Sequence, residues 1–123
     1  MRKKILFQCV EQAKQMIKTT ESKFQHFTFI IQENKVIGYG MNRKGDPSKM
    51  FGYPDYANIH SESDAFRRCR VDIKKDFSVV NVRLNRFGDF RNSKPCECCY
   101  GFLDSLGVKE IYFTTDIGWC KIV

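Results

Sequence analysis

The sequence lacks any long hydrophobic run, any internal repeat and any linker-like stretch rich in Pro, Gly or Ser. No segment approaches the roughly 20 apolar residues that span a bilayer, which excludes a transmembrane helix, and no membrane partner is expected. Residues 2–4 are basic, but too few apolar residues follow them to form a secretory leader. Without repeats or linkers, the 123 residues are predicted to form a single cytoplasmic domain, residues 1–123.

The chain does contain enough apolar and aromatic residues for a packed core. Hydrophobic residues make up 42% of it, including 11 Phe and 5 Tyr, and a chain of this length buries about two-thirds of the surface that its unfolded form exposes. Six cysteines are present. In a reducing compartment, cysteines bind metal or take part in chemistry more often than they form disulfides.

Positive charge is concentrated in one part of the chain. The protein carries 21 basic and 14 acidic residues, a net charge of +7. Between residues 67 and 94, nine basic residues stand against three acidic ones, which leaves +6 in this basic segment alone. We expect part of this charge to attract phosphate groups, although a solvated helix face with ordinary surface lysines would have the same composition.

Hydrophobic periodicity divides the chain into helices and strands. Helical spacing predicts a helix over residues 5–19, and β-forming runs predict strands over 26–31 and 36–41 with a polar turn between them. The remaining elements are a long loop over 42–59, a helix from 61 to 70 or 71, a strand over 78–86, a helix from the cysteines near 96 to Gly107, and strands over 111–113 and 119–123.

The predicted order is therefore α-β-β-α-β-α-β-β, an α/β fold with helices on both faces of a sheet. Only about four residues join the last two strands. This connection is too short for a crossover helix, so the final strand is predicted to run antiparallel to its neighbour.

Two short motifs supply three metal ligands and a carboxylate that is not a ligand. The first is His60-Ser61-Glu62, and the second is Pro95-Cys96-Glu97-Cys98-Cys99. If each motif opens a helix, the sulfurs of Cys96 and Cys99 lie on one face of the first turn, where the helix dipole favours thiolate. With the His60 nitrogen they fill three positions of tetrahedral Zn²⁺, and the fourth admits a water that zinc acidifies to a pKa of about 7. Glu62 is then free to move protons.

This arrangement resembles the zinc-dependent cytidine and deoxycytidylate deaminases, whose signature pairs H-x-E with P-C-x-x-C. The likeness extends from about residue 26 to residue 123, and Ser61 stands where Ala is common. The matching signature residues are His60, Glu62, Pro95, Cys96 and Cys99. The resemblance implies a cytidine deaminase-like three-layer α-β-α fold with a five-stranded mixed sheet, a Zn²⁺ cofactor and hydrolytic deamination of cytosine to uracil, with Glu62 as the catalytic residue.

Two features bear on the branch of this family. The antiparallel last strand is similar to that of cytidine and blasticidin deaminases, whereas tRNA adenosine deaminases and AID/APOBEC-like enzymes have a helix there. The long loop before His60 and the approach to the cysteines over residues 85–94 resemble small deaminase-like proteins of phages and other viruses.

The resemblance also implies substrate contacts. Asn42 matches the Asn that follows the second strand in this family and contacts the sugar or base, with a polar cap at the strand end as the alternative interpretation. The rings of Tyr53 and Tyr56 are predicted to stack on a base or sugar, unless they anchor the loop to the core. The predicted substrate-binding residues are Asn42, Tyr53, Tyr56, Ser61, Lys94 and Pro95.

The sequence leaves several functions open. The first is deamination of a free nucleoside or nucleotide, such as cytidine, deoxycytidine or dCMP. The second is deamination of cytosine in single-stranded DNA or RNA, which the basic segment favours. The third is a non-catalytic nucleic-acid-binding module with a closed zinc site, whose fourth ligand would be Cys9, Cys69, Cys98 or Cys120. Another amino-bearing base, adenine or guanine, and assembly into a homo-oligomer also remain open.

Overall fold

The computed structural model describes residues 1–17, 25–44, 58–74 and 76–122. Every helix and strand expected from the sequence is present in the expected order, and the two-residue strands β3, β4 and β6 are additional. The elements are α1 (Lys3–Ile17), β1 (Gln25–Gln32), β2 (Lys35–Met41), β3 (Arg43–Lys44), β4 (Asn58–Ile59), α3 (Ser61–Arg68), β5 (Ser78–Leu84), β6 (Phe90–Arg91), α4 (Glu97–Ser105), β7 (Glu110–Thr115) and β8 (Gly118–Ile122). None of the described helices is long and apolar enough to cross a membrane.

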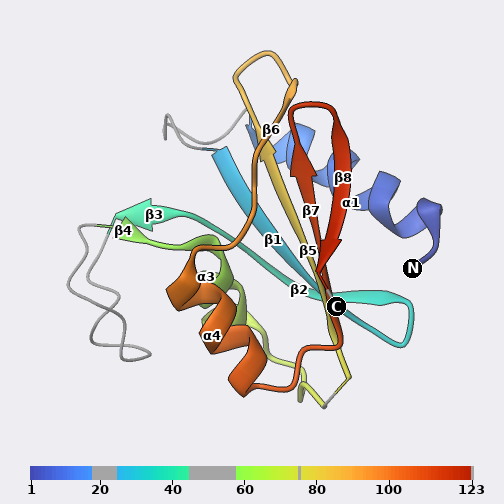
Figure 1. Cartoon of the computed structure of the whole chain (residues 1–123), viewed down its shortest axis with the longest axis vertical. Helices are drawn as coiled ribbons and strands as arrows, with labels where there is room; N and C mark the ends of the chain where they lie inside the picture. The colour runs from blue at the N-terminus through green and yellow to red at the C-terminus, as the bar shows by residue number, and fades with distance from the viewer. Residues whose placement is uncertain (18–24, 45–57, 75, 123) are drawn as a thin grey trace.

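The central sheet is mixed, as the sequence predicts. Its strands lie in the order β2-β1-β5-β7-β8, and β6 pairs with the end of β5 (Figure 1). β5 and β7 are parallel and are joined through α4, whereas β8 is antiparallel to β7. A separate ladder joins β3 to β4 within the predicted long loop. These short strands escape prediction because two residues cannot show an alternating pattern.

One face of the sheet is covered by α1 and is mainly apolar, with buried polar residues at its ends, Gln25 and Ser78. The helix buries one stripe of side chains, whose members recur at helical spacing. They pack on the side chains of β1 and β5 that point to this face. The buried cluster consists of Ile5, Cys9, Val10 and Ala13 from α1 with Phe27, Phe29, Ile31, Val80, Val82 and Leu84 from the sheet.

The opposite face carries α3 and α4, and its character changes along the strands. The register between β1 and β5 places three pairs on this face: Ile30 with Val79, Thr28 with Asn81, and His26 with Arg83. The first pair is part of the second hydrophobic cluster, the second pair is buried but polar, and the third lines a cavity. Steps of two residues along either strand therefore lead from a hydrophobic core to the candidate site.

The close contact between β2 and α3 requires glycine. A Cβ atom on Gly40 would lie 2.2 Å from the backbone nitrogen of Ala65, far inside van der Waals contact. Because Gly40 admits this approach, the start of α3 lies against the end of β2. His60 and Asn42, which flank these two elements, are thereby brought to the same cavity.

α3 ends earlier than the sequence predicts, at Arg68 instead of residue 70 or 71. Cys69 adopts extended backbone angles, and its N–H still bonds to the carbonyl oxygen of Ala65. Its thiol donates to the carbonyl oxygen of Ile37 at 3.5 Å, which ties the exit of the helix to β2. Tertiary contact with the sheet thus ends the helix before the local periodicity does.

Candidate active site

Three side chains that could hold a metal ion meet at the N-terminal ends of α3 and α4. His60 immediately precedes α3, and Cys96 immediately precedes α4. The Nδ1 atom of His60 lies 3.2 Å from the Sγ atom of Cys99 and 3.6 Å from that of Cys96. Their ligand atoms all lie within 4.8 Å of one another, and no other His, Cys, Asp or Glu of the described residues belongs to the cluster.

This geometry fits zinc. Bonds of about 2.0 Å to nitrogen and about 2.3 Å to sulfur at the tetrahedral angle place those atoms about 3.5 Å apart. Both separations measured from Nδ1 are close to that value. One nitrogen and two sulfurs leave the fourth position without a protein ligand, as in catalytic zinc sites. The other cysteines, Cys9, Cys69, Cys98 and Cys120, lie outside the cluster.

The surroundings of the cluster favour the thiolate form of cysteine. Hydrogen bonds with the Cys99 side chain and with His60 lower the pKa of Cys96 to about 3. The backbone N–H of Cys99 also donates to the Cys96 sulfur at 3.4 Å, so Cys96 caps the positive end of α4. The hydrogen bond with Cys96 in turn raises the pKa of His60. An anionic sulfur is the form that zinc binds.

Glu62 lies in the first turn of α3 and lines the same cavity, with only 2% of its surface exposed. Its Oε1 atom accepts a hydrogen bond from the Ser61 hydroxyl at 3.0 Å. Its Oε2 atom accepts one from the Asn81 side-chain amide at 3.1 Å. These bonds offset part of the cost of burying the carboxylate. Each oxygen keeps a second lone pair.

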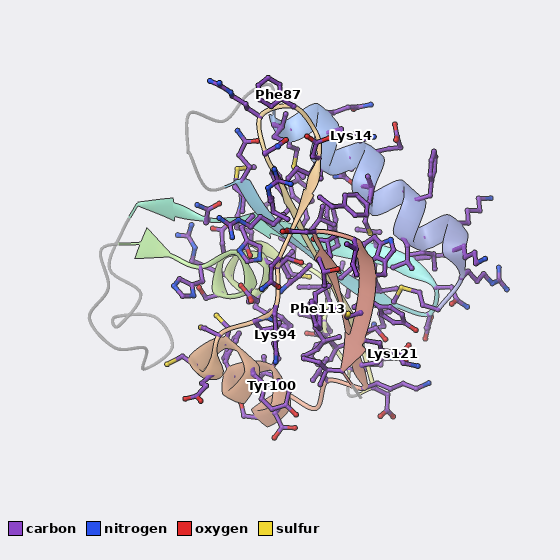
Figure 2. All side chains as sticks on the ribbon, turned by 45° about the horizontal axis from the view of Figure 1, so that its top comes forward. Lys14, Phe87, Lys94, Tyr100, Phe113 and Lys121 are labelled. Atoms are coloured by element: carbon purple, nitrogen blue, oxygen red, sulfur yellow. The ribbon has the colours of Figure 1, made fainter. Side chains whose placement is uncertain are left out.

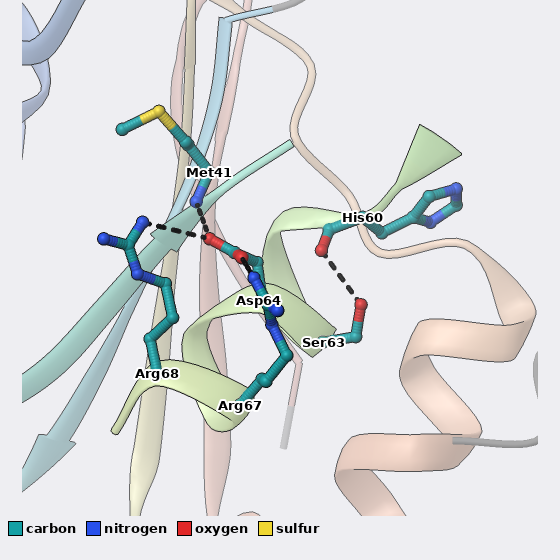
Figure 3. Close-up of polar contacts among 6 residues, drawn as sticks. All are labelled: Met41, His60, Ser63, Asp64, Arg67 and Arg68. Atoms are coloured by element: carbon teal, nitrogen blue, oxygen red, sulfur yellow. Dashed lines mark hydrogen bonds and ion pairs between the residues drawn. The ribbon is translucent and has the colours of Figure 1, made fainter. Parts of the chain in front are cut away.

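Asp64 attaches the start of α3 to the sheet (Figure 3). This fully buried carboxylate accepts a hydrogen bond from the backbone N–H of Met41 at 3.0 Å and forms ion pairs with Arg67 at 3.2 Å and Arg68 at 3.8 Å. The Ser63 hydroxyl donates to the carbonyl oxygen of His60 at 3.0 Å. The backbone of His60 is therefore held by its own helix, which in turn is held by β2.

The cavity has a volume of about 310 Å³, which is within the range of small-ligand sites. Three predicted substrate-binding residues line it: Asn42, Ser61 and Lys94. Pro95 is buried and is not among the described lining residues, and Tyr53 and Tyr56 lie outside the described part of the chain. The described lining is His26, Asn42, His60, Ser61, Glu62, Arg83, Lys94 and Cys96.

Comparison with known proteins gives the family. A family model described as the cytidine and deoxycytidylate deaminase zinc-binding region matches residues 1–115. The chain belongs to this deaminase family. No curated protein matches the sequence significantly. Membership in a zinc-binding family and the His-Cys-Cys cluster both fit a Zn²⁺ cofactor.

Two solved structures share the deaminase fold. The crystal structure of dCMP deaminase from the cyanophage S-TIM5 in complex with dCMP and dUMP has a TM-score of 0.62 and 16% sequence identity. The alignment covers 92% of this chain and 82% of the phage enzyme. The apo form of the same enzyme gives the same score and identity, with 84% of its chain covered. At this identity the likeness establishes the three-layer fold.

Two residues of the deaminase cavity are not found by sequence reasoning, which treats His26 as an ordinary strand residue. His26 and Arg83 pair across β1 and β5 and both line the cavity. The Nε2 atom of His26 lies 3.4 Å from the carbonyl oxygen of Ser93, and burial lowers the pKa of His26. The strand pattern shows which residues share a face, but only the register places this pair beside Glu62.

Asn42 both caps the strands and lines the cavity. Its side-chain oxygen accepts a hydrogen bond from the backbone N–H of His26 at 3.1 Å, and its own N–H donates to the carbonyl oxygen of His26 at 3.1 Å. The cap predicted as the alternative role is therefore present. A role in substrate binding stays a prediction.

The basic segment of residues 67–94 does not gather at the cavity. Arg83 and Lys94 line it. Arg67 and Arg68 pair with the buried Asp64 of α3, and Arg70 lies in a separate groove beside β2. Among the basic residues of this segment that the structure describes, Arg83 and Lys94 are thus the two placed to meet a ligand in the cavity.

Proposed function

We propose that this protein catalyses the zinc-dependent hydrolytic deamination of cytosine to uracil in a free nucleotide of the dCMP type. The observation that carries the proposal is the position of Glu62 beside the His60, Cys96 and Cys99 cluster, in one cavity of small-molecule size. A structural zinc site with four protein ligands would not need a buried carboxylate such as Glu62 in the same cavity.

His60, Cys96 and Cys99 would hold the zinc ion, which when bound supplies a water acidified to near-neutral pKa. Glu62 acts first as a base and then as an acid. It accepts a proton and delivers it to N3 of the ring, and a second transfer lets the exocyclic amine leave as ammonia. In the net reaction, water replaces the C4 amino group with a carbonyl oxygen, and cytosine becomes uracil.

Two cations at the cavity favour a nucleotide over a nucleoside. Arg83 and Lys94 come from different segments, the end of β5 and the residue two places before Cys96, and both line the cavity. Figure 2 shows Lys94 between α4 and the strands. A phosphate beside these side chains would be stabilised electrostatically. The phage enzyme of similar fold, crystallised with dCMP and dUMP, supports this substrate class.

The direct test is to incubate the zinc-loaded protein with cytosine, cytidine, deoxycytidine, CMP and dCMP and to measure product mass. Deamination exchanges NH₂ for OH and adds about one dalton. We expect dCMP to have the highest kcat/KM. Turnover with none of these compounds would contradict the proposal.

Lys94→Gln tests the phosphate contact, and Lys109→Gln, an exposed lysine outside the cavity lining, is its matched control. We expect Lys94→Gln to raise KM for dCMP by about tenfold, the loss of one charge-assisted bond. KM for deoxycytidine should stay nearly constant, and the control should leave both values unchanged. An equal effect on the nucleotide and the nucleoside would assign Lys94 to the base or to the fold.

The β5–β6 hairpin favours a second candidate, deamination of cytosine in single-stranded nucleic acid. Phe87 is 75% exposed at the hairpin, with the guanidinium of Arg86 4.9 Å from its ring centroid. Such a ring is a platform on which a base can stack. Binding through several phosphates should weaken steeply between low and moderate salt, whereas binding of a free nucleotide should respond far less.

The zinc content of the Cys98→Ser variant distinguishes the third hypothesis, a non-catalytic zinc module, from the two enzymatic ones. The three-ligand site predicts that this variant keeps one zinc per chain, because Cys98 lies outside the cluster. Loss of zinc from Cys98→Ser would indicate a closed site with four protein ligands.

A further inference from the structure

Glu62 is part of a closed ring of buried polar contacts, three of which are hydrogen bonds. The Thr28 hydroxyl lies 2.7 Å from the Ser61 hydroxyl and donates to the side-chain oxygen of Asn81 at 2.7 Å. Ser61 and Asn81 each donate to one oxygen of the Glu62 carboxylate. The four side chains come from β1, α3 and β5, and none is more than 2% exposed.

We propose that Thr28 is a positioning residue for the deamination reaction: through Asn81, it holds the Glu62 carboxylate in the orientation in which it transfers protons. The inference rests on the proposed function, because the role is exercised through Glu62. Thr28 is not among the described residues that line the cavity, so it acts on the reaction only through its neighbours.

The orientation of Asn81 is determined by its partners. Its side-chain NH₂ group donates to Glu62 at 3.1 Å and to the carbonyl oxygen of Ser93 at 3.2 Å, and its side-chain oxygen accepts from Thr28. A flipped amide would place NH₂ against the Thr28 hydroxyl and oxygen against two acceptors. The two acceptors, Glu62 and the Ser93 carbonyl, therefore select this orientation, and the Thr28 hydroxyl holds the amide in place by donating to its oxygen.

The ring also connects Glu62 to the segment that carries Cys96. The Ser93 hydroxyl donates to the backbone oxygen of Asn81 at 2.9 Å, which complements the bond from the Asn81 amide. Ser93 is fully buried and lies three residues before Cys96. The Glu62 carboxylate and the segment that leads to Cys96 are thus both hydrogen-bonded to the Asn81 side chain of β5. This shared contact would keep the distance between Glu62 and Cys96 constant during the reaction.

Burial makes these contacts difficult to replace. At 0–2% exposure, solvent water is kept away from the groups that the loss of one hydroxyl would leave without a partner. A network in a low-dielectric interior is rigid when every member is satisfied. Removal of the Thr28 hydroxyl should therefore release Asn81, which donates to Glu62.

Thr28→Val and Thr28→Ser form a matched pair for the test. Valine keeps the shape and removes the hydroxyl, whereas serine keeps the hydroxyl and removes a methyl group. We expect Thr28→Val to lower kcat on the order of tenfold, with KM within about twofold of wild type and zinc content unchanged. Thr28→Ser should keep kcat within about twofold of wild type, even though it loses buried contact.

Thr115→Val is the control for loss of a strand hydroxyl elsewhere. The Thr115 hydroxyl donates to the carbonyl oxygen of Gly118 at the β7–β8 turn, so this variant should lower Tm and leave kcat unchanged. The proposal is overturned if Thr28→Val and Thr28→Ser lower kcat equally, if Thr28→Val changes KM instead of kcat, or if it leaves both at wild-type values.

A stability measurement that needs no turnover tests the ring itself. Thr28→Val and Asn81→Ala each break the same hydrogen bond, so the double variant should lose less Tm than the sum of the two single losses. Additive losses would contradict the ring. Absence of turnover in wild type would refute the proposed function and with it the catalytic role of Thr28, whereas the Tm cycle would still show whether the ring forms.

Discussion

The two faces of the central sheet are built from the same strands but serve different purposes. Along β1, the side chains of Phe27, Phe29 and Ile31 point toward α1 and are uniformly apolar. The alternate residues point toward α3 and change from apolar Ile30 through buried polar Thr28 to His26 at the cavity. The α1 face of β1 therefore contributes hydrophobic burial along these residues. The opposite face, called the graded face below, becomes more polar along β1 from Ile30 to His26 at the cavity.

The difference shows how a small protein can bury charge near a catalytic site. The apolar face needs only volume and shape, because dispersion and hydrophobic burial are not directional. The graded face must satisfy each polar atom, since an unpaired buried donor or acceptor costs about 1–3 kcal/mol. Around Glu62, hydrogen bonds from Ser61 and Asn81 pair both carboxylate oxygens two residues away from the hydrophobic cluster.

The sharpest test of the comparison is Glu62→Gln. This change on the graded face should reduce kcat by about 10²–10⁴, because the amide cannot accept and return a proton. Zinc content and Tm should stay near wild type, since Gln retains hydrogen-bonding capacity. Measured turnover with metal analysis and thermal unfolding checks this, and retained activity would remove Glu62 from the mechanism.

Phe29→Ala on the α1 face should have the opposite signature. Phe29 is completely buried, and its truncation should lower the free energy of unfolding by about 3–5 kcal/mol. The turnover of the molecules that remain folded should be unchanged. Denaturant unfolding combined with an activity assay at low temperature separates the two quantities. A loss of kcat per folded molecule would show that the two faces are not independent.

Gly40→Ala should affect both properties at once, because Gly40 lies where β2 meets the start of α3. The added Cβ would be 2.2 Å from the Ala65 backbone, so α3 must shift, and we expect a loss of about 1–3 kcal/mol in stability and a lower kcat. Gly38→Ala is the matched control, because its Cβ would meet the movable Cys69 side chain at 2.9 Å. Equal losses from both variants would contradict this account.

The smallest expected effect is a pH dependence from His26. Burial lowers the pKa of His26 below its usual value near 6.5, so the unfolded chain binds this proton more readily than the folded protein does. Stability should therefore decrease as pH falls through that value and below, by about 1.4 kcal/mol per unit of lowered pKa.

His26→Gln should lose less stability than wild type between pH 7.5 and 5.5. Thermal unfolding of the zinc-loaded proteins, with zinc content measured at both pH values, makes the comparison. The same loss in both proteins would assign the pH dependence to other groups.

Much of the fold follows from local pattern. Helical spacing identifies α1, β-forming runs identify β1 and β2, and the short last connection correctly predicts that β8 is antiparallel. The positive backbone angles of Glu33 and Asn34 agree with the predicted hairpin turn. Element ends are less predictable, because the contact of Cys69 with β2 ends α3, and nothing in the helix itself indicates that point.

Within the candidate site, the motif predicts the residues whose spacing is short. His60 and Glu62 share one helix start, and Cys96 and Cys99 share another, so the metal cluster could be anticipated. Ser61 shows what the motif alone does not predict. The sequence presents it as a small replacement for Ala, whereas in the structure its hydroxyl contacts both Glu62 and Thr28.

The sequence by itself determined the chemistry proposed for this protein, because the candidate metal ligands and the carboxylate proposed to carry the proton lie close together in the chain at two helix starts. The tertiary structure alone decided which distant side chains serve that chemistry. Thr28, Asn81 and Ser93 join Glu62 because the β1–β5 register and the docking of α3 bring them together. A residue's periodicity shows which face it points to, but only the packed strands and helices determine what it meets there.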